Sequence, residues 1–83
     1  MYKIKIEKRV IKDLKNIPGK DTNKILDAIE KLSLNPYPHN FKTLKGRPAF
    51  RIRVGDYRII YSINNDELLI LIIKVGHRKD VYS

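Results

Sequence analysis

Cysteine is absent from this 83-residue chain. Disulfide bonds and thiolate-ligated zinc sites are therefore excluded, and the absence fits a protein of a reducing cytosol. No stretch approaches the roughly 18 consecutive apolar residues that a membrane-spanning helix requires, and residues 1–5 lack the pattern of a secretory leader. We therefore expect a cytoplasmic protein that has no membrane partner.

Motifs for metals and cofactors are also missing. The two histidines, His39 and His77, stand among scattered acids without the spacing of metal ligands. No glycine-rich loop follows a predicted strand, so nothing favours a P-loop or a dinucleotide site. A chain of this length forms one small core and leaves no interior for a large organic group. The sequence thus predicts a single domain over residues 1–83, with no metal and no cofactor.

Acidic residues are scarce where basic ones gather. The chain carries 18 Lys and Arg against 9 Asp and Glu, a formal net charge of +9. Residues 31–60 hold seven of the basic residues and a single acid, Asp56, so they supply +6 of that excess. Arginine replaces lysine in this segment, and its planar guanidinium suits bidentate recognition of phosphate. The pattern predicts an anionic partner bound by the middle of the chain.

The first half of the chain predicts a strand and two helices. Residues 2–6 alternate between apolar and charged side chains, which is typical of a half-buried strand. Apolar residues then recur at helical spacing as far as Pro18-Gly19, which ends the first helix. Asp21 or Thr22 caps a second helix, which ends before Asn35-Pro36. A turn of four or five residues joins the two into a helical hairpin.

The second half predicts three strands after a loop at residues 35–44. The apolar-rich runs cover residues 50–54, 57–63 and 68–75, and Gly55-Asp56 between the first two is the signal of a type II′ hairpin. The third run is apolar at both parities, so we expect it to be buried on both faces and central. The predicted fold is α+β, in the order β-α-α-β-β-β, with the helical hairpin on one face of an antiparallel-rich four-stranded sheet.

The two-residue turn fixes a register that gathers arginines. Arg53 stands opposite Arg58, and Arg51 shares their face, while the other face of the hairpin is wholly apolar or aromatic. Like charges directly opposite each other are destabilising, so this cluster predicts a bound anion. The alternative interpretation is a solvated sheet face, or ion pairs with distant acids such as Glu7 or Asp27.

The last residues form a second unusual segment. His77 and Arg78 follow the third predicted strand directly, and Tyr82 lies close to the chain end. If this strand pairs beside the second one, the tail can fold back over the arginine face. We therefore expect these three residues to converge on the anion that the arginines bind.

Two segments together resemble a known family. The hairpin Arg53–Tyr61 reads R-x-G-x-Y-R-x-x-Y and the tail Val75–Tyr82 reads V-G-H-R-x-x-V-Y. These segments, with the length, the order of elements and the basic bias, resemble the RelE/ParE superfamily of toxins from type II toxin–antitoxin systems, and the RelE branch more closely. The resemblance covers essentially the whole chain.

The resemblance implies a ribosome-dependent endoribonuclease that cleaves mRNA in the ribosomal A site, with contacts to 16S ribosomal RNA. Such enzymes need no metal: the RNA 2′-hydroxyl attacks the adjacent phosphate and leaves a 2′,3′-cyclic phosphate and a 5′-hydroxyl. This chemistry requires charge stabilisation and proton transfer. A cognate RelB-like antitoxin is the implied partner, and it neutralises the toxin by covering or distorting the basic face.

The resemblance also implies residue roles. Arg58 matches the arginine that stabilises the scissile phosphate, and Arg78 matches the tail arginine that assists the leaving oxygen or stabilises the transition state. Tyr82 matches a general base, while His77 stands where some relatives use histidine for acid–base work, so the two are rivals for proton transfer. The candidates for binding the RNA backbone are Arg51, Arg53, Lys45 and Arg47.

Two other functions stay open at the level of sequence. A ParE-like toxin shares the fold and acts on DNA gyrase, but that branch typically lacks the set formed by Arg58, Arg78 and Tyr82. A non-catalytic module that binds RNA or the ribosome needs the same basic patch and no group for proton transfer.

Overall fold

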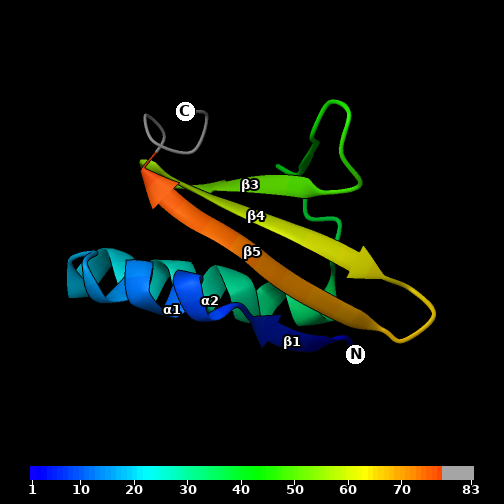
Figure 1. Ribbon diagram of the computed structural model, residues 1–83, viewed down its shortest axis with the longest axis horizontal. Helices are drawn as coiled ribbons and strands as arrows, with labels where there is room; N and C mark the ends of the chain where they lie inside the picture. The colour runs from blue at the N-terminus through cyan, green and yellow to red at the C-terminus, as the bar shows by residue number, and fades with distance from the viewer. Residues whose placement is uncertain (78–83) are drawn as a thin grey trace.

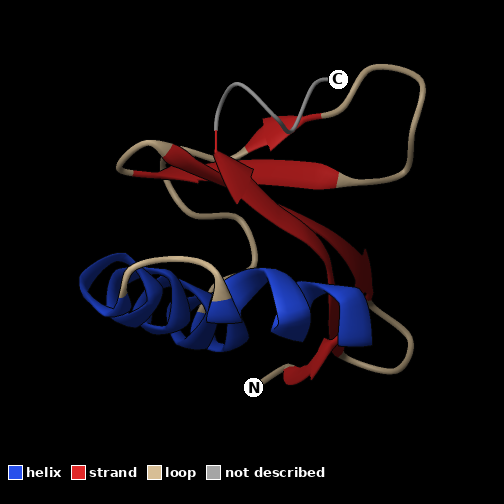
Figure 2. Cartoon of the chain, turned by 60° about the vertical axis from the view of Figure 1, so that its left-hand side comes forward, coloured by secondary structure: helices blue, strands red, loops and turns tan. Residues whose placement is uncertain are grey.

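The computed structural model describes residues 1–77 and forms a helical layer against a twisted sheet (Figures 1 and 2). The chain begins with a strand, continues with the two helices, and supplies the remaining strands from its second half. The elements are β1 (Lys3–Ile6), α1 (Lys8–Lys15), α2 (Gly19–Leu34), β2 (Lys42–Thr43), β3 (Phe50–Val54), β4 (Tyr57–Asn64) and β5 (Leu69–His77). In the part of the chain that the structure describes, neither helix is both long and apolar enough to cross a membrane.

The sheet has five strands in the order β1-β5-β4-β3-β2, and only the β1–β5 pair is parallel. The predicted α+β class and the mainly antiparallel sheet are confirmed, but the predicted count of four strands is wrong. The additional strand, β2, lies in the segment predicted to be a loop and pairs with β3. Gly46 makes this possible, because its φ of +75° lets the chain turn back between β2 and β3.

The turn between the helices is shorter than predicted. Helix α1 ends at Lys15, and α2 begins at Gly19 with Pro18 as its N-cap, so three residues connect them. Asp21 and Thr22, the predicted caps, lie inside α2 instead. The Thr22 hydroxyl lies 3.3 Å from the carbonyl oxygen of Leu14 and 3.2 Å from that of Ile17, and it donates to the chain at the end of α1. Thr22 thus closes the tight turn rather than starting the helix.

Both helices cover one face of the sheet, and the core lies between the two layers (Figure 2). Apolar side chains at helical spacing on α1 and α2 meet alternate residues of β3, β4 and β5 there. The buried members of this cluster are Val10, Ile25, Ile29, Leu32, Ile52, Ile59, Tyr61, Ile70, Ile72 and Val75.

Strand β5 is interior, as predicted, but it is not buried on both faces. Its helix-facing residues Ile70 and Ile72 are fully buried, whereas Leu71 and Ile73 on the outer face are only half-buried. No helix of the described residues covers that outer face. The pairing of β4 with β5 also shifts register between Ile60 and Tyr61, which adds one residue to β5.

Tyr61 ties the loop after α2 to the core. Its side chain is fully buried in the helix-facing layer, and its phenol oxygen donates a hydrogen bond of 2.8 Å to the carbonyl oxygen of Pro36. The ring also packs against Phe50, with centroids 5.9 Å apart. Burial raises the pKa of Tyr61 to about 12, and the nearby Tyr37 adds to the shift. Tyr61 therefore holds the loop that leads to residues 39–42.

Alkaline pH should destabilise the fold through Tyr61. Because its pKa is raised in the folded state, the folded protein keeps this proton while the unfolded chain loses it above pH 10, the ordinary tyrosine value. The free energy of unfolding should fall by about 2–3 kcal/mol between pH 10 and pH 12 through this residue. Urea denaturation at pH 8 to 12 measures it. Tyr61→Phe should lose about 1 kcal/mol at pH 8, with a shallower fall at high pH. Parallel curves for the two proteins would contradict the expectation.

Candidate functional site

The predicted arginine face is confirmed. Arg53 pairs with Arg58 and Arg51 with Ile60 across β3 and β4, and Gly55 has the positive φ of 61° that a type II′ turn requires. The opposite face of this hairpin packs into the core. The three arginines therefore lie on the face of the sheet that points away from the helices.

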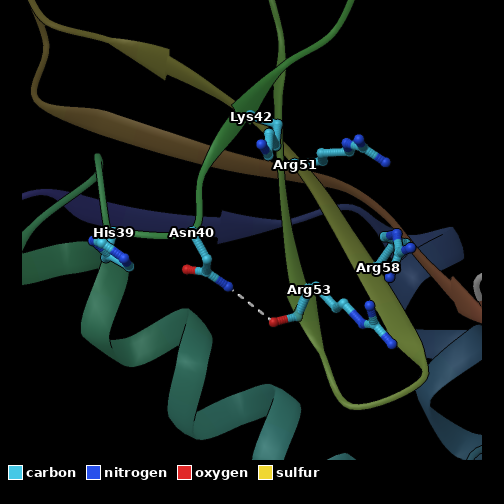
Figure 3. A pocket seen from close by; sticks show the side chains of 6 residues that line it. All are labelled: His39, Asn40, Lys42, Arg51, Arg53 and Arg58. Atoms are coloured by element: carbon cyan, nitrogen blue, oxygen red, sulfur yellow. Dashed lines mark hydrogen bonds between the residues drawn. The ribbon is translucent and has the colours of Figure 1, made fainter.

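A cavity of about 420 Å³ opens over this face (Figure 3). Strands β2, β3 and β4 and the loop before β2 contribute its walls, and five of its six lining side chains are basic. The lining residues are His39, Asn40, Lys42, Arg51, Arg53 and Arg58.

Hydrogen bonds and strand pairing set the geometry of the cavity. The Asn40 amide donates to the carbonyl oxygen of Arg53 at 3.1 Å, which continues the β2–β3 contact beyond the two-residue strand. The Arg53 Nε donates to the carbonyl oxygen of Gly55 at 3.0 Å, which orients its guanidinium group. Lys42 stands opposite Arg51 in the ladder. Arg51 and Arg58 are half-buried, whereas Arg53 is exposed.

The electrostatics of the cavity favour an anion. None of the described residues that line it is acidic. The alternative interpretation paired the arginines with Glu7 or Asp27, but Glu7 lies 2.9 Å from the Nε of Arg9, and Asp27 lies 3.1 Å from the Nζ of Lys31. Guanidinium groups on one rigid hairpin can hold a phosphate through several charge-assisted hydrogen bonds. The arrangement therefore suits a phosphate group of a nucleic acid backbone.

Three lining residues were not predicted from the sequence. His39, Asn40 and Lys42 reach the cavity because β2 folds the preceding segment back along β3. Two prolines made this segment read as an irregular loop. Gly46, which lies in the turn between β2 and β3, is the residue that could have indicated a second hairpin.

Two predicted RNA-binding residues lie elsewhere. Lys45 and Arg47 are exposed in the turn between β2 and β3, and they are not among the residues that line the cavity. They add positive charge to the turn that joins two of the strands lining the cavity. Their role in RNA binding stays a prediction.

The predicted convergence of His77 with the arginines is wrong. His77 pairs with Tyr57, and their ring centroids lie 5.7 Å apart on the face that carries the helices. On the arginine face, Arg58 instead stands opposite Gly76. Arg78 and Tyr82, the other two residues of the predicted convergence, lie outside the described residues.

Comparisons with known proteins identify the family of this chain. Residues 4–82 match the family model of the ParE toxin of type II toxin–antitoxin systems, parDE. The chain is 39% identical to the toxin RelE3 and 36% identical to RelE1 of Methanocaldococcus jannaschii, and the alignments cover 98% and 99% of this chain and 96% of each relative.

A solved structure shows the same architecture. The RelE–RelB complex of Pyrococcus horikoshii contains a chain that superposes with a TM-score of 0.85 at 33% identity, covering 95% of this chain and 97% of that one. Sequence identity and shared fold thus extend over nearly the full length of both proteins. The chain therefore belongs to the RelE/ParE superfamily, as a toxin of a RelBE-type toxin–antitoxin system.

Proposed function

We propose that this toxin is an endoribonuclease that acts with the ribosome and cleaves mRNA in the A site. The observation that carries the proposal is the cationic cavity, in which Arg51, Arg53 and Arg58 line one wall beside Lys42. RNA cleavage by a 2′-hydroxyl concentrates negative charge on the phosphate that is attacked. Preorganised cations at that point stabilise the transition state more than the substrate, because its charge is larger there.

In this proposal each arginine has a separate role, and Tyr82 transfers the proton. Arg58 binds the oxygens of the scissile phosphate, and Arg51 and Arg53 hold the RNA backbone on either side of it. Arg78 assists the leaving oxygen and Tyr82 takes the proton of the 2′-hydroxyl. Because His77 lies on the helix face beside Tyr57, we prefer Tyr82 to His77 for proton transfer. Cleavage that survives His77→Gln and is lost in Tyr82→Phe would support this choice, and the reverse pattern would overturn it.

The partner of the free toxin in this proposal is a RelB-like antitoxin. In the Pyrococcus horikoshii structure the related chain is bound to RelB. The excess of positive charge on this chain favours an antitoxin whose contact surface carries acidic side chains. Neutralisation follows if that antitoxin covers or distorts the arginine face.

Primer extension on translating mRNA tests the proposed activity. The toxin is added to an mRNA with and without ribosomes, and new 5′ ends are mapped. Cuts within the A-site codon that require ribosomes support the proposal. Intact mRNA together with altered DNA supercoiling favours a ParE-like action on gyrase, and intact nucleic acid of both kinds favours a non-catalytic binding module.

The salt dependence of RNA binding tests the cavity without cleavage. A 2′-O-methyl RNA lacks the attacking hydroxyl and should bind with a log–log salt slope of about −2 to −3, since four cationic side chains line the cavity beside His39. Arg51→Gln should make this slope shallower by about 0.7, as fluorescence anisotropy measures. Lys20→Gln removes an equal charge from the exposed start of α2 and should leave the slope unchanged. Equal slopes for Arg51→Gln and the wild type would place the RNA elsewhere.

A further inference from the structure

A second cavity lies on the helix-facing side of the sheet, opposite the arginine face, near the end of β5. It has a volume of about 360 Å³ and opens between the end of α1 and the end of β5, where Figure 1 shows the tip of β5 above the turn between the helices. The function proposed above makes no use of it. Its walls include Asp13, Asn16, Ile17, Tyr57, Lys74 and His77.

The chemistry of this cavity differs from that of the arginine cavity. Two aromatic rings, Tyr57 and His77, meet edge to face at its sheet side. Ile17 adds an apolar wall, and Asp13 and Asn16 present a carboxylate and an amide from the last turn of α1 and its C-cap. A carboxylate repels phosphate, so the backbone of a nucleic acid is disfavoured here. Aromatic rings beside a few polar groups that donate and accept hydrogen bonds are typical surroundings of a bound nucleobase.

Strand β4 and Gly76 connect the two cavities. Tyr57 and Arg58 are consecutive on β4, so one side chain enters the second cavity while the next lines the arginine cavity. Gly76 is the cross-strand partner of Arg58 and also lines the second cavity. Because glycine has no side chain, β5 presents only backbone at the position opposite Arg58. A nucleotide whose phosphate lies on Arg58 is therefore next to the end of the sheet over which the second cavity opens.

We propose that the cavity between Asp13, Tyr57 and His77 binds the base of a nucleotide adjacent to the phosphate held by Arg58, and so sets a base preference. This inference rests on the function proposed above for its biological meaning. The Asp13 carboxylate only accepts hydrogen bonds, so it selects a base that presents N–H groups. Guanine presents two adjacent ones, N1–H and the 2-amino group, and its O6 can accept a hydrogen bond from the Asn16 amide. The expected order of affinity places guanosine first and uridine, which has no amino group, last.

Nucleoside binding tests the inference directly on the whole protein. The four ribonucleosides and ribose 5-phosphate are titrated separately into labelled protein, and backbone amide shifts are followed by NMR. Guanosine should shift the signals of Asn16, Tyr57 and Lys74, whereas ribose 5-phosphate should shift those of Arg51, Arg53 and Arg58. Absence of guanosine shifts at the second cavity, or equal affinity for all four nucleosides, would overturn the inference.

A pair of isosteric variants sharpens the test. Asp13→Asn keeps the size of an exposed side chain and should weaken guanosine binding at least about fivefold, since a bidentate acceptor is lost. Asp66→Asn makes the same change in the turn between β4 and β5, at the other end of the sheet, and should leave the affinity unchanged. An unchanged affinity in Asp13→Asn would contradict the role of the carboxylate.

The two proposals can fail separately. Nucleoside binding needs neither ribosomes nor cleavage. Guanosine binding at this cavity by a protein that leaves mRNA intact would therefore support the proposed base site and contradict the proposed nuclease activity. Cleavage of mRNA without nucleoside shifts at this cavity would support the proposed nuclease activity and contradict the proposed base site. Where both hold, Asp13→Asn should redistribute the mapped cuts among codons, and Asp66→Asn should not.

Discussion

Replacing Arg58 with lysine is expected to lower the rate of ribosome-dependent mRNA cleavage by about 100- to 1,000-fold, the usual loss when one preorganised donor to a developing oxyanion is removed. Arg58 is central to the arginine face, since it stands between Arg53 on β3 and Gly76 on β5. Its Nη1 atom is shielded from solvent, so its contacts are screened less than those of an exposed cation. Lysine keeps the charge but loses the planar fork that binds two phosphate oxygens at once.

Cleavage rates from primer extension at saturating ribosome concentration measure this loss. Arg9→Lys is the matched control, because it makes the same substitution on α1, where the guanidinium lies beside Glu7 and donates to the carbonyl oxygen of Ile73. Its cleavage rate should equal that of the wild type. A rate for Arg58→Lys within tenfold of the wild-type rate would show that charge alone suffices at this position, and the proposed role of its fork would be wrong.

The arginine face could be predicted because turn chemistry fixes strand register. A two-residue turn that begins with glycine fixes which residue of β3 pairs with which residue of β4. Because side chains alternate between the two faces of a strand, each side chain can then be assigned to a face. Arg53 opposite Arg58 follows from Gly55 alone, and the structure has this pairing. Long-range information was not needed for this part of the site.

The position of His77 could not be predicted because one residue of β5 breaks the count. Ile70 and Ile72 are buried in the helix-facing core, so strict alternation places His77 on the arginine face. The register shift opposite Ile60 and Tyr61 adds a residue, after which Val75 rather than Lys74 enters the core. Every later side chain of β5 changes face as a result. A bulge of this kind depends on packing between strands and leaves no reliable mark on a strand that is apolar at both parities.

The additional strand was missed for a related reason. Two residues cannot display an alternation, and β2 contains only Lys42 and Thr43. It forms because Gly46 turns the chain and β3 offers an unpaired edge, both of which act at the level of the assembled sheet. The consequence for the site is large, because β2 brings Lys42, Asn40 and His39 to the cavity.

Truncating Ile72 to alanine should cost about 2–5 kcal/mol of unfolding free energy, the usual range for a large aliphatic side chain removed from a packed core. Ile72 is fully buried on β5, where it pairs with Ile6 of β1 and Tyr61 of β4. A domain of this size has one core and a total stability of only about 4–12 kcal/mol, so the variant loses a large share of it. Urea denaturation followed by circular dichroism measures the loss.

Leu34→Ala is the control for this truncation. It also removes an aliphatic side chain, but from the end of α2, where Leu34 is 71% exposed, and it should change the stability by less than about 0.5 kcal/mol. A difference between the two variants below about 1 kcal/mol would contradict a single dominant core.

The test also bears on function, because β4 and β5 carry this core on one face and Arg58 with Gly76 on the other. The opposed charges of Arg53 and Arg58 oppose folding, and burial on the helix-facing side of the same strands offsets that cost.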